Sequence, residues 1–145
     1  MVHVKLVVCR LRGVCATMQP DTTIFLVEDD AAVRDSLKLA LETYGYRVRD
    51  FASSAEFLRS GASREKSCLV LDLHMPEISG LELVERLIAD KPAPPAVLIT
   101  GRADDAVRRR ARAVGVFAVI EKPFDTALLM RAMDRAMEGA GATWH

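Results

Sequence analysis

The sequence predicts an α/β fold in which a parallel β-sheet carries helices on both faces. Short, β-rich apolar segments alternate five times with segments whose apolar residues recur at helical spacing. Polar residues directly follow several of the apolar segments, as happens where buried parallel strands end at a ligand-binding edge. A chain of 145 residues is long enough to build one such domain around a substantial core.

The composition is typical of a soluble globular protein without a dominant electrostatic partner. Hydrophobic residues make up 50% of the chain and charged residues 28%. Lys and Arg total 20, as do Asp and Glu, which argues against bulk nucleic acid or an anionic membrane as the partner. The sequence has no apolar run of membrane-spanning length and no adequate signal-peptide core. Cys9, Cys15 and Cys68 show neither a metal-ligand spacing nor a disulfide framework, so we expect a cytoplasmic location.

Three parts are expected along the chain. Residues 1–21 differ in pattern from the rest, and two interpretations stay open: an additional edge strand, or a non-native or disordered extension ahead of a start at Met18. We favour the extension. Residues 22–138 carry the alternating pattern and form the domain, and residues 139–145 are expected to be a loose tail.

The first strand and helix follow from local pattern and capping chemistry. Residues 23–27 are apolar and β-rich, which predicts a strand. Asp30 is well placed to cap a helix over residues 31–44, and Gly45 is suited to end it. The apolar face of this helix consists of residues at helical spacing: Val33, Leu37, Leu41 and Tyr44.

The second strand is expected over residues 46–51. Its charged residues alternate with apolar ones, which indicates greater exposure than for the other strands. Ser53 and Glu56 give a capping-box signature for a short helix that stops near Gly61.

The third strand is the centre of the pattern. Residues 68–71 are a short apolar run, typical of a strand buried on both faces, and the run ends on Asp72. Pro76 prevents the strand from continuing, and Ser79 opens the next helix with a second capping box. Asp72 is therefore expected at the carboxyl end of a buried strand, although the residue taken alone fits a turn cap equally well.

The last third of the chain continues the alternation. Residues 96–99 predict another buried strand, which ends on Thr100. The remaining elements are a helix ended by Gly115, a strand and a final helix, expected over residues 103–114, 116–120 and about 125–137.

The residues with chemical potential follow the strands. Because the carboxyl ends of parallel strands share one edge of the sheet, five side chains are expected to converge there: Glu28, Asp29, Asp72, Thr100 and Lys122. Crowded carboxylates repel one another unless a cation lies among them, and Mg²⁺ is the common oxygen-liking choice near phosphate chemistry. A carboxylate can also act as a nucleophile toward phosphorus, while a lysine and a threonine hydroxyl stabilise the transferred group.

Three motifs give the sequence a resemblance to a known family. They are Asp72-Leu-His-Met-Pro-Glu-Ile-Ser-Gly80, Ile99-Thr100-Gly101 and Glu121-Lys122-Pro123-Phe124. Together they resemble the response-regulator receiver domain of two-component signalling, in its FixJ-type branch, over about residues 22–138. The resemblance implies a flavodoxin-like (βα)5 three-layer sandwich whose five parallel strands have the order 2-1-3-4-5.

The resemblance also implies a role for each site residue. Asp72 accepts a phosphoryl group from a histidine kinase or a histidine phosphotransfer protein. Together with Asp72, Mg²⁺ is bound directly by Asp29, through water by Glu28, and by the main-chain carbonyl of His74.

Two further residues complete the implied phosphoryl site. Thr100 and Lys122 contact the phosphoryl oxygens, and the Lys122–Pro123 peptide bond is cis. The chain is then a phosphoacceptor with self-phosphotransfer and autodephosphorylation activity only, rather than an enzyme. His74 and Arg102 occupy the positions that tune the rate of hydrolysis.

The sequence departs from the family pattern at the switch position. The family usually carries an aromatic residue three positions before the conserved lysine, and here that position is Val119. We expect Phe117 to lie on the same face of the strand. Either Phe117 substitutes in part, or aromatic gating is absent. At the first acidic position, Glu28 replaces the commoner aspartate.

The output of the domain is expected to pass through a protein partner. The chain ends at His145, so a stand-alone receiver is expected, without a DNA-binding domain or direct DNA contact. Members of the family often form phosphorylation-dependent homodimers through the fourth helix, fifth strand and fifth helix, so the resemblance implies such a homodimer as one possibility. The arginines at 108, 109, 110 and 112 predict either a docking surface for an acidic partner or a solvated helix face.

Two other functions compete with a phosphorylatable receiver. A degenerate receiver that binds a protein constitutively is the main alternative, and Val119 is its support. A phosphohydrolase acting on small substrates is disfavoured, because Asp72-Leu-His lacks the second carboxylate of an Asp-x-Asp loop and no P-loop is present.

Overall fold

The computed structural model describes residues 22–62, 66–90 and 93–139. The strands are β1 (Thr23–Val27), β2 (Arg47–Phe51), β3 (Ser67–Asp72), β4 (Ala96–Thr100) and β5 (Ala118–Glu121). The helices are α2 (Ala31–Thr43), α3 (Ser54–Arg59), α4 (Gly80–Ala89), α5 (Asp105–Val114) and α6 (Thr126–Met137). The expected extension over residues 1–21 lies outside the described residues, as do residues 140–145 of the expected tail.

The strands of the described chain form one parallel sheet in the order β2-β1-β3-β4-β5, which confirms the order that the resemblance implied. Val27 of β1 pairs with Leu71 of β3, and Thr100 of β4 pairs with Glu121 of β5. This register brings the carboxyl ends of β1, β3, β4 and β5 to the same edge of the sheet.

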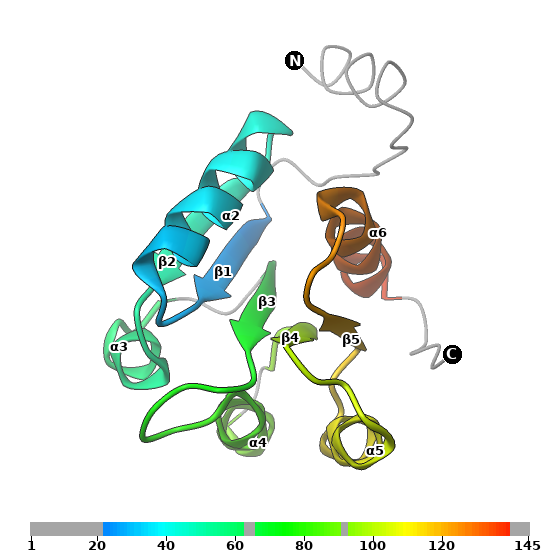
Figure 1. The fold of residues 1–145 in the computed structure, drawn as a ribbon. Helices are drawn as coiled ribbons and strands as arrows, with labels where there is room; N and C mark the ends of the chain where they lie inside the picture. Colours follow the sequence, from blue (N-terminus) through cyan, green and yellow to red (C-terminus); the bar gives the residue numbers. More distant parts are fainter. Residues whose placement is uncertain (1–21, 63–65, 91–92, 140–145) are drawn as a thin grey trace.

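Helices cover both faces of the sheet, so the domain has three layers (Figure 1). Helices α2 and α6 pack on one face, and α3, α4 and α5 pack on the other. The two cores follow from strand alternation: Ile24 and Leu26 face the α2/α6 side, whereas Phe25 and Val27 face the α3/α4/α5 side. No helix in the described ranges is both long enough and apolar enough to cross a membrane.

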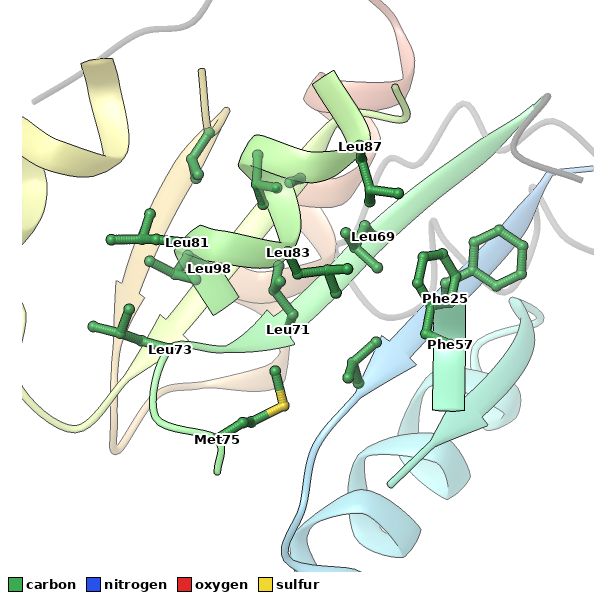
Figure 2. Packing of buried hydrophobic residues seen from close by; sticks show 14 of the residues in the cluster. Phe25, Phe57, Leu69, Leu71, Leu73, Met75, Leu81, Leu83, Leu87 and Leu98 are labelled. Atoms are coloured by element: carbon green, nitrogen blue, oxygen red, sulfur yellow. The ribbon is translucent and has the colours of Figure 1, made fainter. Parts of the chain in front are cut away.

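The core on the α3/α4/α5 side is tightly interlocked. Figure 2 shows Phe25 of β1 against Phe57 of α3, with their ring centroids 5.2 Å apart and tilted by 60°. Leu69 and Leu71 of β3 lie beside the α4 leucines in the same view. Strand β3 is buried along its whole length, as its apolar run predicted.

The predicted helix caps are confirmed. Asp30, Ser53 and Ser79 each accept a hydrogen bond from the main-chain N–H three residues further on. Gly115 ends α5 in the left-handed conformation, with φ of 105°.

Two predicted boundaries were early by two residues. The helix predicted from residue 103 begins at Asp105, because Asp104 is its N-cap and accepts a hydrogen bond from the Val107 N–H. The strand predicted from residue 116 begins at Ala118, because Val116 still donates its N–H to the Ala111 carbonyl of α5.

Gly80, the first residue of α4, lets this helix approach the end of β3. A Cβ atom built at Gly80 would lie 2.5 Å from the Asp72 carbonyl oxygen and 3.1 Å from the Leu73 Cα. Both neighbours are main-chain atoms, so neither can move aside without shifting the loop that follows Asp72.

We predict that Gly80→Ala destabilises the domain by about 1–3 kcal/mol, because the added methyl group overpacks this approach. Urea denaturation measures the change. Gly101→Ala is the matched control, since no heavy atom lies within 4 Å of a Cβ there, and it should change stability by less than about 0.5 kcal/mol. Equal stability of the two variants would show that α4 does not depend on this close approach.

Candidate functional site

Three carboxylates gather at the carboxyl edge of the sheet. Glu28 and Asp29 follow β1, and Asp72 is the last residue of β3. Each of the three offers one oxygen atom, and these oxygens lie within 4.8 Å of one another. Glu28 is only 2% exposed and Asp72 9%, whereas Asp29 is exposed. The site is therefore a partly buried concentration of negative charge with one side open to solvent.

Lys122 supplies positive charge to this cluster. Its Nζ donates to Glu28 Oε1 at 3.2 Å and to Asp72 Oδ2 at 3.1 Å. The end of β5 positions the lysine, because the Lys122 N–H donates to the Thr100 carbonyl at 2.8 Å. The Lys122–Pro123 peptide bond is cis, as the resemblance implied.

The surroundings shift the acid–base balance of the cluster. Burial, reinforced by the hydrogen bond and charge of Asp72, raises the pKa of Glu28 to about 7, although Lys122 works in the opposite direction. Burial alone would lower the pKa of Lys122, but the hydrogen bonds and charges of Asp72 and Glu28 outweigh it and raise that pKa. The lysine therefore stays charged, and ionisation of Glu28 is unfavourable without a further cation.

The donor set fits a hard divalent cation such as Mg²⁺. The second oxygen of Glu28, Oε2, is buried and has no hydrogen-bond partner among the described residues. Such a buried carboxylate oxygen is costly unless a cation contacts it. Clustered carboxylate oxygens are the ligands that Mg²⁺ uses, and exposed Asp29 leaves the cluster accessible to the ion's water molecules.

The loop after β3 holds one oxygen of Asp72. The His74 main-chain N–H donates to Asp72 Oδ1 at 3.1 Å, and the His74 residue itself is exposed. Both carboxylate oxygens of Asp72 are thus hydrogen-bonded, one to His74 and the other to Lys122, which fixes the direction of the carboxylate.

Thr100 lies at the same edge but is turned toward its own loop. The Thr100 side chain is fully buried, and its Oγ1 is 3.2 Å from both the main-chain N and the main-chain O of Arg102. The sheet therefore brings Thr100 to the expected edge while its hydroxyl is engaged with the loop that follows β4.

The prediction for Phe117 was wrong. Phe117 packs against the core on the α2/α6 side, whereas Val119 packs against the core on the α3/α4/α5 side. The alternation rule fails because Phe117 precedes the first residue of β5, where the regular strand geometry has not yet begun. Phe117 is therefore not placed to substitute for an aromatic residue at position 119.

Sequence reasoning missed two residues that restrain the loops of the site. Arg34 of α2 donates from Nη1 to the Glu28 carbonyl at 2.8 Å. Glu121, at the end of β5, accepts a hydrogen bond from the Ala103 main-chain N–H at 3.3 Å, which ties β5 to the loop after Thr100. One feature of the sequence pointed to Arg34. A cation near the amino end of a helix is unfavourable without partners outside the helix, and the first turn of α2 contains no acidic residue.

The chain was compared with known families and curated proteins. A family model described as the response regulator receiver domain matches residues 24–134. The chain is 37% identical over 125 residues to the transcriptional regulatory protein FixJ of Azorhizobium caulinodans, an alignment that covers 86% of this chain and 59% of that protein. It is 36% identical over 118 residues to FixJ of Rhizobium meliloti, covering 81% of this chain and 58% of that protein.

Solved structures give the same picture. The crystal structure of FixJ-N has a TM-score of 0.78 to this chain at 36% identity, and covers 87% of this chain and 100% of its own. Full-length FixJ from B. japonicum has a TM-score of 0.73 at 33% identity, and the match covers 83% of this chain and 59% of that one. The chain thus spans less than two thirds of the curated relatives and of this full-length structure.

Three observations lead to the same family. The fold is that of a known receiver, the family model matches most of the chain, and a cluster of acidic residues lies beside a lysine. The chain belongs to the response regulator receiver domain family of two-component signalling.

Proposed function

We propose that residues 22–138 are a phosphorylatable receiver in which Asp72 accepts a phosphoryl group from a histidine kinase or a histidine phosphotransfer protein. The single observation that carries this proposal is the bridge from Lys122 to Asp72 and Glu28 inside the carboxylate cluster. A lysine held 3.1 Å from the acceptor oxygen is placed to balance the charge that phosphorylation adds.

The transfer step follows from the orientation of Asp72. A carboxylate oxygen attacks phosphorus, and the P–N bond of the phosphohistidine breaks. The electron pair of that bond stays on the imidazole nitrogen, and an acyl phosphate forms on Asp72. Lys122 keeps its proton and contacts a phosphoryl oxygen. Thr100 contacts another once its hydroxyl leaves Arg102.

Asp29, Asp72 and the main-chain carbonyl of His74 are the proposed direct Mg²⁺ ligands, and Glu28 is proposed to act through water. Bound Mg²⁺ neutralises the clustered carboxylates and the charge on the phosphoryl oxygens. The orphaned oxygen of Glu28 supports this assignment, because it is a buried acceptor beside two further carboxylates.

The acyl phosphate is proposed to control a protein-binding surface and to be lost by self-hydrolysis, without turnover of a small substrate. The surface includes α5, β5 and α6, where phosphorylation-dependent homodimers of related receivers form, and its proposed downstream partner is a protein. We keep the cytoplasmic location expected from the sequence, which suits the buried, free thiol of Cys68. A degenerate, constitutive binding module is less well supported, because such a module has no need for Lys122 to bridge two buried carboxylates.

Incubation with acetyl phosphate and Mg²⁺ should add one phosphoryl group to the wild-type chain. Asp72→Asn should remove the acceptor and abolish the adduct, which intact-protein mass measures directly. Asp30→Asn is the matched control: it neutralises a carboxylate beside the acidic pair, yet asparagine caps α2 equally well, so labelling should persist. An adduct that survives Asp72→Asn, or a folded wild type that takes no adduct in Mg²⁺, would overturn the proposal.

The raised pKa of Glu28 predicts that protons compete with Mg²⁺. With a pKa of about 7 in the metal-free protein, affinity for Mg²⁺ should fall by about tenfold between about pH 8 and about pH 6, since binding displaces one proton. Calorimetric titration at several pH values measures this slope. Glu28→Gln should abolish the slope in this range, and a wild-type affinity that is independent of pH would contradict the prediction.

The same pKa shift predicts how the stability of the metal-free protein depends on pH. The pKa of Glu28 in the folded state lies above its ordinary value of 4.5. The contribution of Glu28 to stability is therefore fully present below that ordinary value and is lost as pH rises through about 7. Thermal unfolding should show a larger stabilisation by Mg²⁺ above pH 7 than below it. An equal stabilisation on both sides would assign the orphaned oxygen to another role.

A further inference from the structure

Arg34 occupies a position that does not favour its own helix. It is the fourth residue of α2, the helix that follows the loop with Glu28 and Asp29. The amino end of a helix carries partial positive charge, so a cation there is unfavourable unless it has partners outside the helix. The first turn of α2 contains no acidic residue, and the carboxylate of the N-cap, Asp30, is bonded to the Val33 N–H.

The guanidinium of Arg34 has two such partners. Nη1 donates to the Glu28 carbonyl at 2.8 Å, and Nε lies 3.4 Å from Asp50 Oδ2 on strand β2. The side chain is only 17% exposed, so these contacts are shielded from solvent. Arg34 therefore links the acidic loop to the neighbouring strand.

The contact with the Glu28 carbonyl restrains the main chain that carries both carboxylates. A peptide group is planar, so holding its oxygen restricts the rotation before it, in Glu28, and the rotation after it, in Asp29. The N–H of Glu28 is separately held by the Phe51 carbonyl at 3.1 Å, which fixes the start of the loop. Among the described contacts, Arg34 is the side chain that holds the peptide between the two acidic residues.

We propose that Arg34 is a positioning residue for the metal site, which aims the Glu28 and Asp29 carboxylates at Mg²⁺; this inference rests on the proposed function. The role needs the forked guanidinium, because its separate N–H groups reach Glu28 and Asp50 together. Arg34 itself contacts neither the phosphoryl group nor the ion.

Lys38 provides a matched control on the same helix. Its Nζ donates to the other oxygen of Asp50 at 3.1 Å, so it shares the anchor of Arg34. Among the described residues, its hydrogen bond and ion pair are to Asp50 and not to the acidic loop. Removing Lys38 therefore weakens the attachment of α2 to β2 and leaves the Glu28 carbonyl bonded to Arg34.

The experiment compares Arg34→Met with Lys38→Met in the full chain. Calorimetric titration with Mg²⁺ alone should show that Arg34→Met raises the dissociation constant by about tenfold or more, as loss of a residue behind a metal ligand commonly does. Lys38→Met should stay close to wild type. A purely structural role would lower the thermal midpoint of both variants and leave the dissociation constants equal to that of wild type.

The rate of phosphorylation gives a second readout. With acetyl phosphate, the Arg34→Met rate should approach that of wild type at saturating Mg²⁺ and fall behind at low Mg²⁺. If Arg34→Met does not fold, Arg34→Lys carries the same comparison, because lysine keeps the charge and loses the fork. Its dissociation constant should exceed those of wild type and Lys38→Met.

Two outcomes would overturn the positioning role while the proposed function stands. One is unchanged Mg²⁺ affinity in the folded Arg34 variant. The other is an equal loss in Lys38→Met, which would indicate a general effect of charge. A wild-type chain that binds no Mg²⁺ would instead overturn the proposed function, and the positioning role with it.

Discussion

The contact on which the rest of the site depends is the ammonium group of Lys122, shared between Glu28 and Asp72. Two of the three clustered carboxylates are buried, and like charges at such short range cannot coexist in a poorly solvated place without a cation. Lys122 compensates only part of this negative charge, since Glu28 keeps one oxygen without a hydrogen-bond partner in the described structure. The remaining imbalance is what makes the cluster suited to a divalent ion and to phosphoryl transfer.

The sheet makes this concentration of charge sustainable. Strand β3 is buried along its length between two hydrophobic layers, so Asp72 is carried by a rigid element rather than by a loop. Strand β1 pairs with β3 in register, which puts Glu28 beside Asp72. Helix α4 approaches the end of β3 through Gly80 and packs against the main chain of Asp72 and Leu73. The energy of apolar burial therefore holds together charges that would separate on their own.

The loop after β4 is held to its neighbours by several hydrogen bonds. Thr100 engages the main chain of Arg102, Lys122 reaches back to the Thr100 carbonyl, and Glu121 holds the Ala103 N–H. These hydrogen bonds connect the carboxyl edge of the sheet to β5 and to the loop that leads into α5. Val119 lies in the same region but packs into the core on the α3/α4/α5 side, and Phe117 faces the opposite core. Neither residue therefore supplies an aromatic side chain at the position where the family usually carries one.

The sequence by itself determined the alternation of elements, the helix caps at Asp30, Ser53 and Ser79, and the edge at which the polar residues converge. These features depend on periodicity and on neighbours a few residues away, which local pattern records. Strand order and the cis peptide came through family resemblance. Only the tertiary structure decided that Thr100 turns into its own loop, that Phe117 packs on the α2/α6 side and that Arg34 holds the Glu28 carbonyl. The direction of each of these side chains is set by the packing and hydrogen-bond partners available around it in the fold, which sequence spacing does not reveal.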